Sequence, residues 1–217
     1  MWDELKWLEQ GAIPARDIHR GRHGRNTIYF PSVKNQGQVI CESVLEASYC
    51  IWLEWDVDVK SYHAQPHTFR WTWNTARFQY TPDFYVIHEL AANHFTEVKP
   101  DFTRAPAKYR ITLREFIDHC DRESIRFKLA DAGSIQRAVR LSNLKMLYTL
   151  IHRITQWEAD YCSAFLSQQD TTLSLREVCL HPTPPSLRAL AKAIFSGELL
   201  ADLDRPLTLD SKLTKRM

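Results

Sequence analysis

The chain has 217 residues and a formal net charge of +2, from 28 Lys and Arg against 26 Asp and Glu. Hydrophobic residues make up 44% and charged residues 25%, a balance that excludes a largely disordered chain. The small net charge excludes a strongly basic nucleic-acid binder, and no apolar run is long enough to span a bilayer. Five scattered cysteines without a CxxC pair indicate a reduced, cytoplasmic protein.

The first 36 residues are expected to contain a short helix followed by a basic segment. Residues 2–10 have the pattern of an amphipathic helix, which Gly11 ends. The stretch ARDIHRGRHGRN, residues 15–26, carries four arginines and two histidines and is expected to lack regular structure. Such a segment could bind phosphate or an acidic partner surface, or it could be a solvated loop.

A helix is expected next, from about Gly37 to Trp55, because apolar residues recur there at helical spacing. Strand-like stretches rich in β-branched and aromatic residues follow, with hairpin turns expected at Asn74 and at Ala91 to Asn93. These stretches are VDVKSYHA (57–64), HTFRWTW (67–73), ARFQYTPDFYVIHE (76–89) and HFTEVKP (94–100).

Residues 106–124 have a second helical pattern with Pro106 near its start, and residues 125–131, IRFKLAD, have the composition of a strand. The order of helix, several antiparallel strands, helix and strand predicts an α/β sandwich around a central mixed sheet.

The pattern becomes mainly helical from about Asp131. Three helical segments and a Pro-rich link precede LLADLDRPLTLDSKL, whose two apolar pieces could pair as a small β-wing. This order predicts a winged-helix-like second domain, with the boundary somewhere between Asp131 and Asn143. We therefore expect three parts: residues 1–36, a main domain at 37–135 and a C-terminal domain at 136–217.

Two acidic residues and a lysine lie on the strands of one expected hairpin. Pro82 keeps the backbone extended before Asp83, and in the stretch EVK Glu97 and Lys99 share one face of their strand. If the strands pair, Asp83 and Glu97 face each other, and two carboxylates with a main-chain carbonyl suit Mg²⁺ or Mn²⁺. Lys99 could orient or help deprotonate a water, or stabilise charge on a phosphate. The hairpin therefore predicts a metal site suited to phosphodiester cleavage.

A plainer explanation exists for the same residues. A Pro-Asp pair followed by ExK arises by chance in many sequences, and a Glu and a Lys two residues apart are common on an exposed strand. Glu42, on the expected helix, is a third acidic candidate, although it could be a surface charge like Glu46 or Glu54. The order of helical Glu, Asp after Pro, hairpin, ExK and helix favours the metal site.

The stretches ESVLEASYCIWLEWDVDVKSYHAQP, YTPDF and EVKP resemble the TnsA-type endonuclease subunit of heteromeric transposases, over roughly residues 37–126. The resemblance implies a restriction-endonuclease-like (PD-(D/E)xK) domain that hydrolyses the non-transferred strand at transposon ends. Its catalytic pattern falls on Glu42, Asp83, Glu97 and Lys99. Glu42, Asp83, Glu97 and the carbonyl of Val98 would hold Mg²⁺, with Mn²⁺ as a substitute and two ions per site.

The resemblance also implies partners and a location. The partners are double-stranded DNA at transposon ends, a DDE-type transposase subunit and an AAA+ ATPase regulator, in the bacterial cytoplasm at the nucleoid. Gln65, in the matching QP element, would be structural or close to DNA. Lys108 and Arg110, at the start of the second main-domain helix, could contact DNA phosphates or lie on a solvated face.

Two other functions fit the same residues. The chain could be a stand-alone PD-(D/E)xK nuclease of a restriction or repair system. It could also be a DNA- or protein-binding adaptor in which the C-terminal half acts and the nuclease domain has decayed. The intact set of acidic residues with Lys99 argues against decay.

Overall fold

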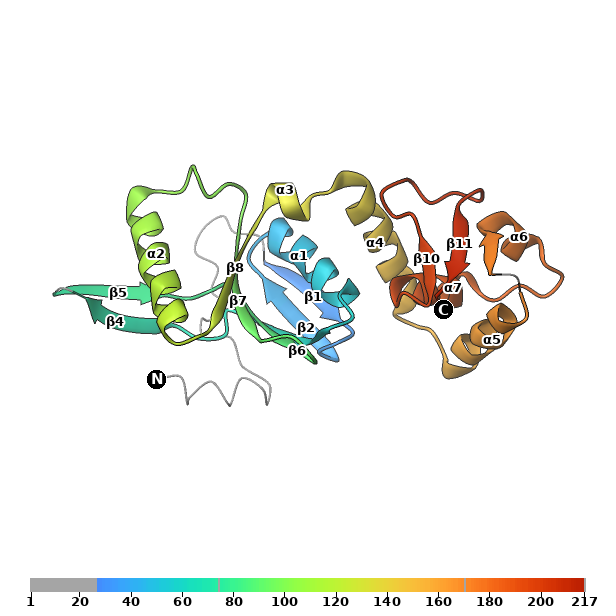
Figure 1. The fold of residues 1–217 in the computed structure, drawn as a ribbon, viewed down its shortest axis with the longest axis horizontal. Helices are drawn as coiled ribbons and strands as arrows, with labels where there is room; N and C mark the ends of the chain where they lie inside the picture. Colours follow the sequence, from blue (N-terminus) through green and yellow to red (C-terminus); the bar gives the residue numbers. More distant parts are fainter. Residues whose placement is uncertain (1–26, 74, 170, 217) are drawn as a thin grey trace. The chain divides into compact units, whose positions relative to one another are not determined.

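The computed structural model describes residues 27–73, 75–169 and 171–216 (Figure 1). The described residues up to Gln136 form one compact unit, and those from Arg137 onward form a second. The helix expected at residues 2–10 and the basic segment at 15–26 lie outside the described residues. No helix in the described part of the chain is long and apolar enough to cross a membrane.

The first unit is built on a four-stranded mixed sheet with the strand order β3-β6-β7-β8. β3 (Val59–Ala64), β6 (Phe84–His88) and β7 (His94–Lys99) are antiparallel neighbours. β8 (Arg126–Asp131) runs parallel to β7, so a crossover must join these two strands. The mixed α/β architecture predicted from the sequence is confirmed.

Two helices cover the two faces of this sheet. α1 (Val44–Trp55) packs its Tyr49 ring 5.5 Å from that of Phe84. α2 (Ala107–Arg122) is the crossover between β7 and β8, and it packs against Phe95. Because Phe84 pairs with Thr96 and Tyr85 with Phe95, Phe84 and Phe95 point to opposite faces of the sheet. The sheet is therefore the middle layer between α1 and α2.

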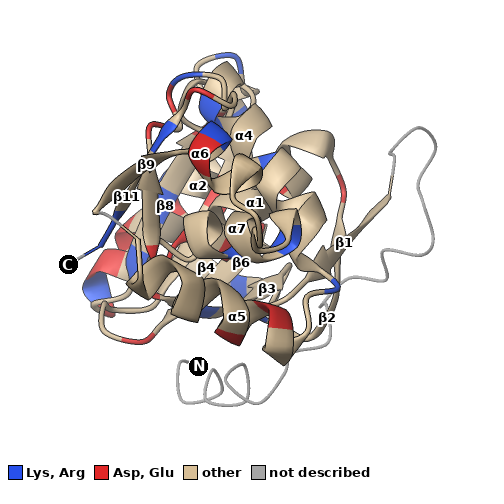
Figure 2. Cartoon of the chain, turned by 90° about the vertical axis from the view of Figure 1, so that its right-hand side faces the viewer, with Lys and Arg blue, Asp and Glu red and all other residues tan. Residues whose placement is uncertain are grey.

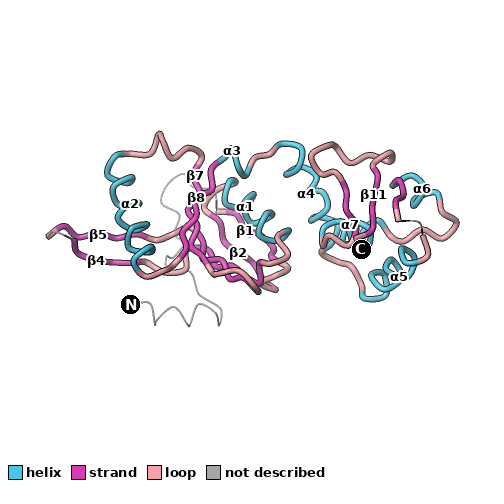
Figure 3. Tube along the Cα trace, in the orientation of Figure 1, coloured by secondary structure: helices cyan, strands magenta, loops and turns pink. Residues whose placement is uncertain are grey.

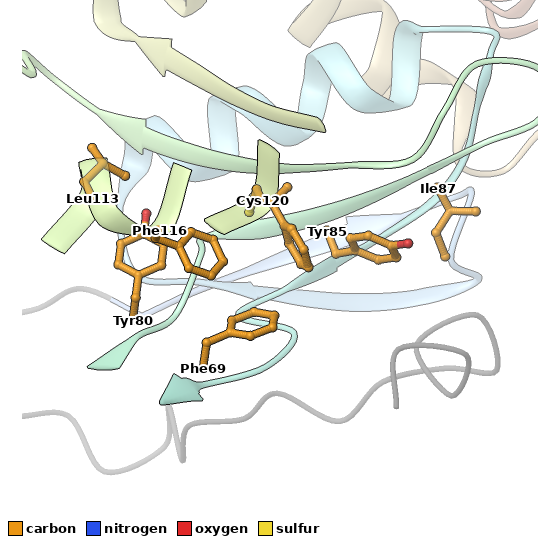
Figure 4. Packing of buried hydrophobic residues seen from close by; sticks show 8 residues of the cluster. Phe69, Tyr80, Tyr85, Ile87, Leu113, Phe116 and Cys120 are labelled. Carbon is orange, nitrogen blue, oxygen red and sulfur yellow. The ribbon is translucent and has the colours of Figure 1, made fainter. Parts of the chain in front are cut away.

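The core between α2 and the sheet is mainly aromatic (Figure 4). Phe116 of α2 is fully buried, and its ring centroid lies 4.9 Å from that of Phe69 and 4.6 Å from that of Tyr80. The rings are tilted against one another, an arrangement that adds to the gain from burying their area. The buried members are Phe69, Tyr80, Tyr85, Ile87, Phe95, Leu113, Phe116 and Cys120.

The helix expected from Gly37 is wrong in its first part. Gly37–Cys41 is strand β2, which pairs antiparallel with β1 (Ile28–Ser32). Val39 and Cys41 are buried and alternate with less buried residues, as in a strand, and the helix begins only at Val44. The expected start of the main domain at residue 37 therefore falls inside a hairpin, just after its turn.

The long strand expected at residues 76–89 is broken in the middle. β5 (Ala76–Tyr80) pairs with β4 (Phe69–Trp73) in a separate two-stranded hairpin, whereas β6 begins at Phe84 in the central sheet. Pro82 lies in the break, where it cannot donate a ladder hydrogen bond. Asp83 is thus placed immediately before β6.

The second unit combines helices with short strands (Figure 3). Its described strands form a three-stranded antiparallel sheet in the order β10-β11-β9. The expected pairing of the last two apolar pieces is present, but the sheet has a third strand, which the sequence did not predict. β9 is only three residues long, and its last residue also caps the next helix. The elements are α4 (Ala138–Ile151), α5 (Gln156–Ser167), β9 (Thr172–Ser174), α6 (Leu175–Leu180), α7 (Leu187–Phe195), β10 (Leu199–Ala201) and β11 (Lys212–Lys215).

Basic and acidic residues are interspersed along the described ribbon (Figure 2).

α3 (Ala132–Ile135) follows β8 at the end of the first unit, and the Ile135 carbonyl accepts a hydrogen bond from Trp52 Nε1 at 2.9 Å. This bond anchors α3 on α1.

Replacement of Phe116 by Ala tests the aromatic core. We expect Phe116→Ala to lower the free energy of unfolding of the first unit by about 3–5 kcal/mol, because it removes a fully buried ring. Ile111→Ala on the same helix is the control, since Ile111 is 57% exposed and should change stability by no more than about 0.5 kcal/mol. Urea unfolding measures both, and equal losses would contradict this description of the core.

Candidate active site

A cavity of about 780 Å³ lies where the paired ends of β6 and β7 meet the first turns of α1 and α2. Its walls include all four residues predicted to be catalytic. The lining residues are Glu42, Ser43, Leu45, Glu46, Gln79, Tyr80, Thr81, Asp83, Glu97, Val98, Lys99, Pro100, Pro106, Lys108, Tyr109 and Thr112.

Asp83 and Glu97 are brought together by the pairing of their strands. Because Phe84 pairs with Thr96, Asp83 lies opposite Glu97 on the same face. Asp83 Oδ2 also accepts a hydrogen bond of 2.8 Å from the Val98 N–H, which fixes the carboxylate against β7. Asp83 and Glu97 therefore face each other, as the hairpin pattern predicted.

Gln65 holds the backbone of Asp83 from the other side. Its N–H donates a hydrogen bond of 2.8 Å to the Asp83 carbonyl, and its own φ is +48°. Gln65 is buried and is not among the cavity-lining residues, so it supports Asp83 instead of facing a ligand. Of the two roles expected for it, the structural one agrees with this position.

Lys99 joins the two carboxylates on the same face. Its Nζ lies 2.7 Å from Glu97 Oε1 and 3.6 Å from Asp83 Oδ2. Burial lowers the pKa of Lys99, but Asp83 and Glu97 together raise it by more, so the net shift is upward. Lys99 is therefore a cation at neutral pH.

Glu97 is enclosed by donors. It is 2% exposed, and the hydroxyls of Tyr80 and Tyr109 donate hydrogen bonds to its Oε2 and Oε1. Burial, and then the charge of Glu97, raise the pKa of both tyrosines, which keeps them protonated as donors. The Tyr109 ring also lies under Lys99, with Nζ 5.5 Å from the ring centroid. Sequence reasoning gave neither tyrosine a role, although Tyr80, at the end of β5, is the first residue of the stretch YTPDF. Tyr109, on α2, lies outside the stretches that carry the resemblance.

Glu42 is not on a helix, contrary to the sequence-based expectation. It lies in the bend between β2 and α1, and its N–H donates to Glu46 Oε2 at 2.8 Å. Glu46 is the acidic residue on the first turn of α1, and it lines the cavity while only 7% exposed. Burial raises the pKa of Glu46, although hydrogen bonds from Glu42 and Ser43 offset part of this shift.

The expectation that Glu46 and Glu54 could be surface charges is therefore wrong. Glu54 is 6% exposed and accepts hydrogen bonds from Ser32 and Tyr62, so it anchors β1 and β3 to α1. A signal for Glu46 was present in the sequence. Ser43 and Glu46 have the three-residue spacing of a helix start, and Ser43 Oγ does accept the Glu46 N–H.

The two basic residues proposed at the start of α2 differ in position. Lys108 lines the cavity, which suits a contact with a phosphate. Arg110 is not among the lining residues, and its Nη1 donates to the Thr103 carbonyl at 3.3 Å.

Negative charge is in excess around Asp83. Burial raises the pKa of Asp83 well above its ordinary value, and the neighbouring Glu97 and Glu46 raise it further, while Lys99 acts in the opposite direction. Among the described residues, no group of three or more His, Cys, Asp and Glu side chains is arranged to hold a metal ion. The donor chemistry nevertheless fits a hard divalent cation, which would relieve the repulsion between Asp83 and Glu97.

Comparison with known proteins gives no family for this chain. No protein-family model matches it, and a search of curated proteins finds no match.

The raised pKa of Asp83 predicts how stability changes with pH in the absence of divalent ions. The folded protein binds the proton of Asp83 more tightly than the unfolded chain does. The protonated carboxyl therefore contributes its full stabilisation of the fold below about pH 4, and this contribution is lost as the pH rises through the folded-state pKa. Asp83→Asn cannot titrate. We therefore expect its free energy of unfolding, relative to wild type, to increase from pH 4 toward neutral pH, as measured by urea unfolding with EDTA.

Asp101→Asn is the matched control for this experiment. Hydrogen bonds from Thr103 lower the pKa of Asp101, so the stability it contributes is lost only below about pH 4. The free energy of unfolding of this variant, relative to wild type, should therefore change little between pH 4 and neutral pH. If the relative free energies of unfolding of the two variants changed with pH in the same way, the pKa of Asp83 would not be raised by folding.

Proposed function

We propose that this protein is a metal-dependent DNA endonuclease that hydrolyses the non-transferred strand at transposon ends, as a subunit of a heteromeric transposase. The observation that carries the proposal is the gathering of Glu46, Asp83, Glu97 and Lys99 in one cavity, from α1, the start of β6 and the end of β7. Phosphodiester hydrolysis needs carboxylates for a divalent cation and a further positive charge near the phosphate.

The order of the elements supports the restriction-endonuclease-like assignment. The resemblance implies a helix carrying an acidic residue, a hairpin with Asp and then ExK, and a second helix. α1, the β6–β7 hairpin and α2 follow one another in this order, with β8 added parallel to β7. In the described part of the second unit, four helices with a three-stranded antiparallel sheet are compatible with a winged-helix-like domain.

Mg²⁺, with Mn²⁺ as a substitute, would be held by Asp83, Glu97 and the carbonyl of Val98, and Glu46 would take the role that the resemblance assigns to Glu42. The resemblance implies two such ions in each site. The chemistry that such ions supply is stabilisation of charge on the phosphate and activation of a water.

Lys99 and the two tyrosines define what the chain itself contributes. Lys99 is a fixed cation beside both carboxylates, where its ammonium can hold a phosphate oxygen or orient a water. The hydroxyls of Tyr80 and Tyr109 hold the Glu97 carboxylate in one orientation. Lys108, on the wall formed by α2, adds a second cation for the DNA backbone.

The subunit role and its partners rest on the resemblance. The partners proposed are double-stranded DNA at transposon ends, a DDE-type transposase subunit and an AAA+ ATPase regulator. A formal net charge of only +2 agrees with a protein that relies on partners for much of its DNA affinity.

Loss of the central residues should abolish strand cleavage. We expect Asp83→Ala and Lys99→Ala each to reduce cleavage at least about 100-fold, because each removes charge at the reacting phosphate. Cleavage is measured on plasmid DNA carrying transposon ends, with Mg²⁺ and the partner transposase. Asp101→Ala is the control, since this half-exposed carboxylate is not among the cavity-lining residues and should leave the rate unchanged. Full cleavage by the Asp83 variant would refute the proposal.

The two candidate glutamates can be told apart in the same assay. We expect Glu46→Gln to reduce cleavage about tenfold or more, because Glu46 is buried beside Asp83, whereas Glu42→Gln should change the rate less than about threefold. Each variant is isosteric and serves as the control for the other. The reverse ranking would restore the assignment made from the sequence.

A further inference from the structure

The β4–β5 hairpin has two chemically different faces. On one face, Trp71 packs against Phe116 and stacks on His119, with ring centroids 5.9 Å and 6.1 Å apart. Trp73 extends this contact toward the end of α2, with the Arg122 guanidinium 5.5 Å from its ring. This face therefore fixes the hairpin on α2, while its tip projects beyond the helix (Figure 1).

The opposite face carries only polar and cationic side chains. Arg70 lies opposite Gln79, and Thr72 lies opposite Arg77, so these four residues share one face. All four are exposed. We call Arg70, Thr72, Arg77 and Gln79 the outer face of the hairpin.

The positive charge of the outer face is not neutralised within the described part of the chain. The sequence has no Asp or Glu between Asp58 and Asp83, so the hairpin contains no carboxylate. No ion pair to Arg70 or Arg77 is present among the described residues, and the hydrogen bond from Arg70 Nε goes to the neutral Gln79 Oε1, at 3.3 Å. Two guanidinium groups on diagonal neighbours, about 7–8 Å apart at Cα, are a suitable receptor for an anionic chain.

The outer face leads directly into the candidate active site. Gln79 belongs to it and also lines the cavity, and Tyr80, the next residue, holds Glu97. Gln79 thus connects the surface that carries Arg70 and Arg77 with the cavity that contains Asp83 and Glu97. Arginine side chains, with Thr and Gln as neutral donors, are the residue types that contact DNA phosphates.

We propose that the outer face of the β4–β5 hairpin binds the sugar-phosphate backbone of duplex DNA next to the phosphate placed in the cavity. This inference rests on the proposed function and adds to it the surface that positions the substrate. An acidic protein surface is the competing occupant. The continuity with a cavity suited to phosphodiester chemistry favours DNA.

The test compares the wild type with an Arg70→Gln/Arg77→Gln double variant of the full chain. Binding of a short fluorescent duplex is followed by anisotropy in EDTA, so that no cleavage occurs. We expect the double variant to bind about tenfold more weakly, with the slope of log K against log salt reduced by about two. Arg126→Gln/Lys128→Gln is the control, since it removes two exposed cations from β8 and should change binding less than about threefold.

Three results would overturn the proposal. The first is equal binding by the hairpin variant and the control. The second is the absence of duplex binding by the wild type at low salt. The third is displacement of the duplex by polyglutamate as effectively as by unlabelled duplex, which would point to an acidic protein partner. Thermal unfolding of each variant confirms that the fold is intact.

Failure of this inference can be separated from failure of the nuclease proposal. Asp83→Asn is included in the same binding assay and should retain duplex binding, because it removes a negative charge and no cation of the outer face. A hairpin variant that loses DNA binding, together with a wild type that never cleaves, would support the surface and reject the nuclease. If the hairpin variant bound DNA as the wild type does, and the wild type showed cleavage that depends on Asp83, the nuclease would be supported and the surface rejected.

Discussion

The candidate site depends on the register between β6 and β7. With Phe84 opposite Thr96, Asp83 and Glu97 lie on one face, and Lys99 follows two residues later on the same face. A slip of one residue would turn Glu97 and Lys99 toward α1 and leave Asp83 alone. The Val98 N–H bond to Asp83 and the Gln65 N–H bond to the Asp83 carbonyl hold the end of this pairing in place. The aromatic core beneath it fixes β7 against α2.

The same register brings the carboxylates of Asp83 and Glu97 together, and their repulsion costs free energy. The surrounding residues offset part of that cost. Glu97 has its charge balanced by Lys99 and its oxygens bonded to two tyrosines, whereas the pKa of Asp83 stays raised by burial and by its acidic neighbours. Functional sites commonly combine such shifted groups in a cavity. A divalent cation would convert this unfavourable arrangement into a stabilised one, which links the local electrostatics to the proposed chemistry.

Local patterns were sufficient for part of this structure. Alternation along EVK, the Pro before Asp83 and the helix after the strand predicted the hairpin, and with it the common face of Asp83, Glu97 and Lys99. The start of α1 was misplaced because the short apolar run at Val39 and Ile40 suits either a strand or a helix, and its partner strand β1 was not recognised. The hydrogen bonds from Tyr80 and Tyr109 to Glu97 join β5 and α2 to β7, and no local pattern encodes contacts between such distant elements. A three-residue strand such as β9 carries too few residues to show a period.

Calorimetric titration of Mn²⁺ tests the central claim most directly, namely that the carboxylates around Asp83 form a cation site. The wild type and Asp83→Asn are titrated at a slightly acidic pH in two buffers with different ionisation enthalpies. We predict binding to the wild type with release of protons, because the ion replaces the proton favoured by the raised pKa of Asp83, and loss of both signals in the variant. Binding of equal strength and equal proton release in the two proteins would contradict the account.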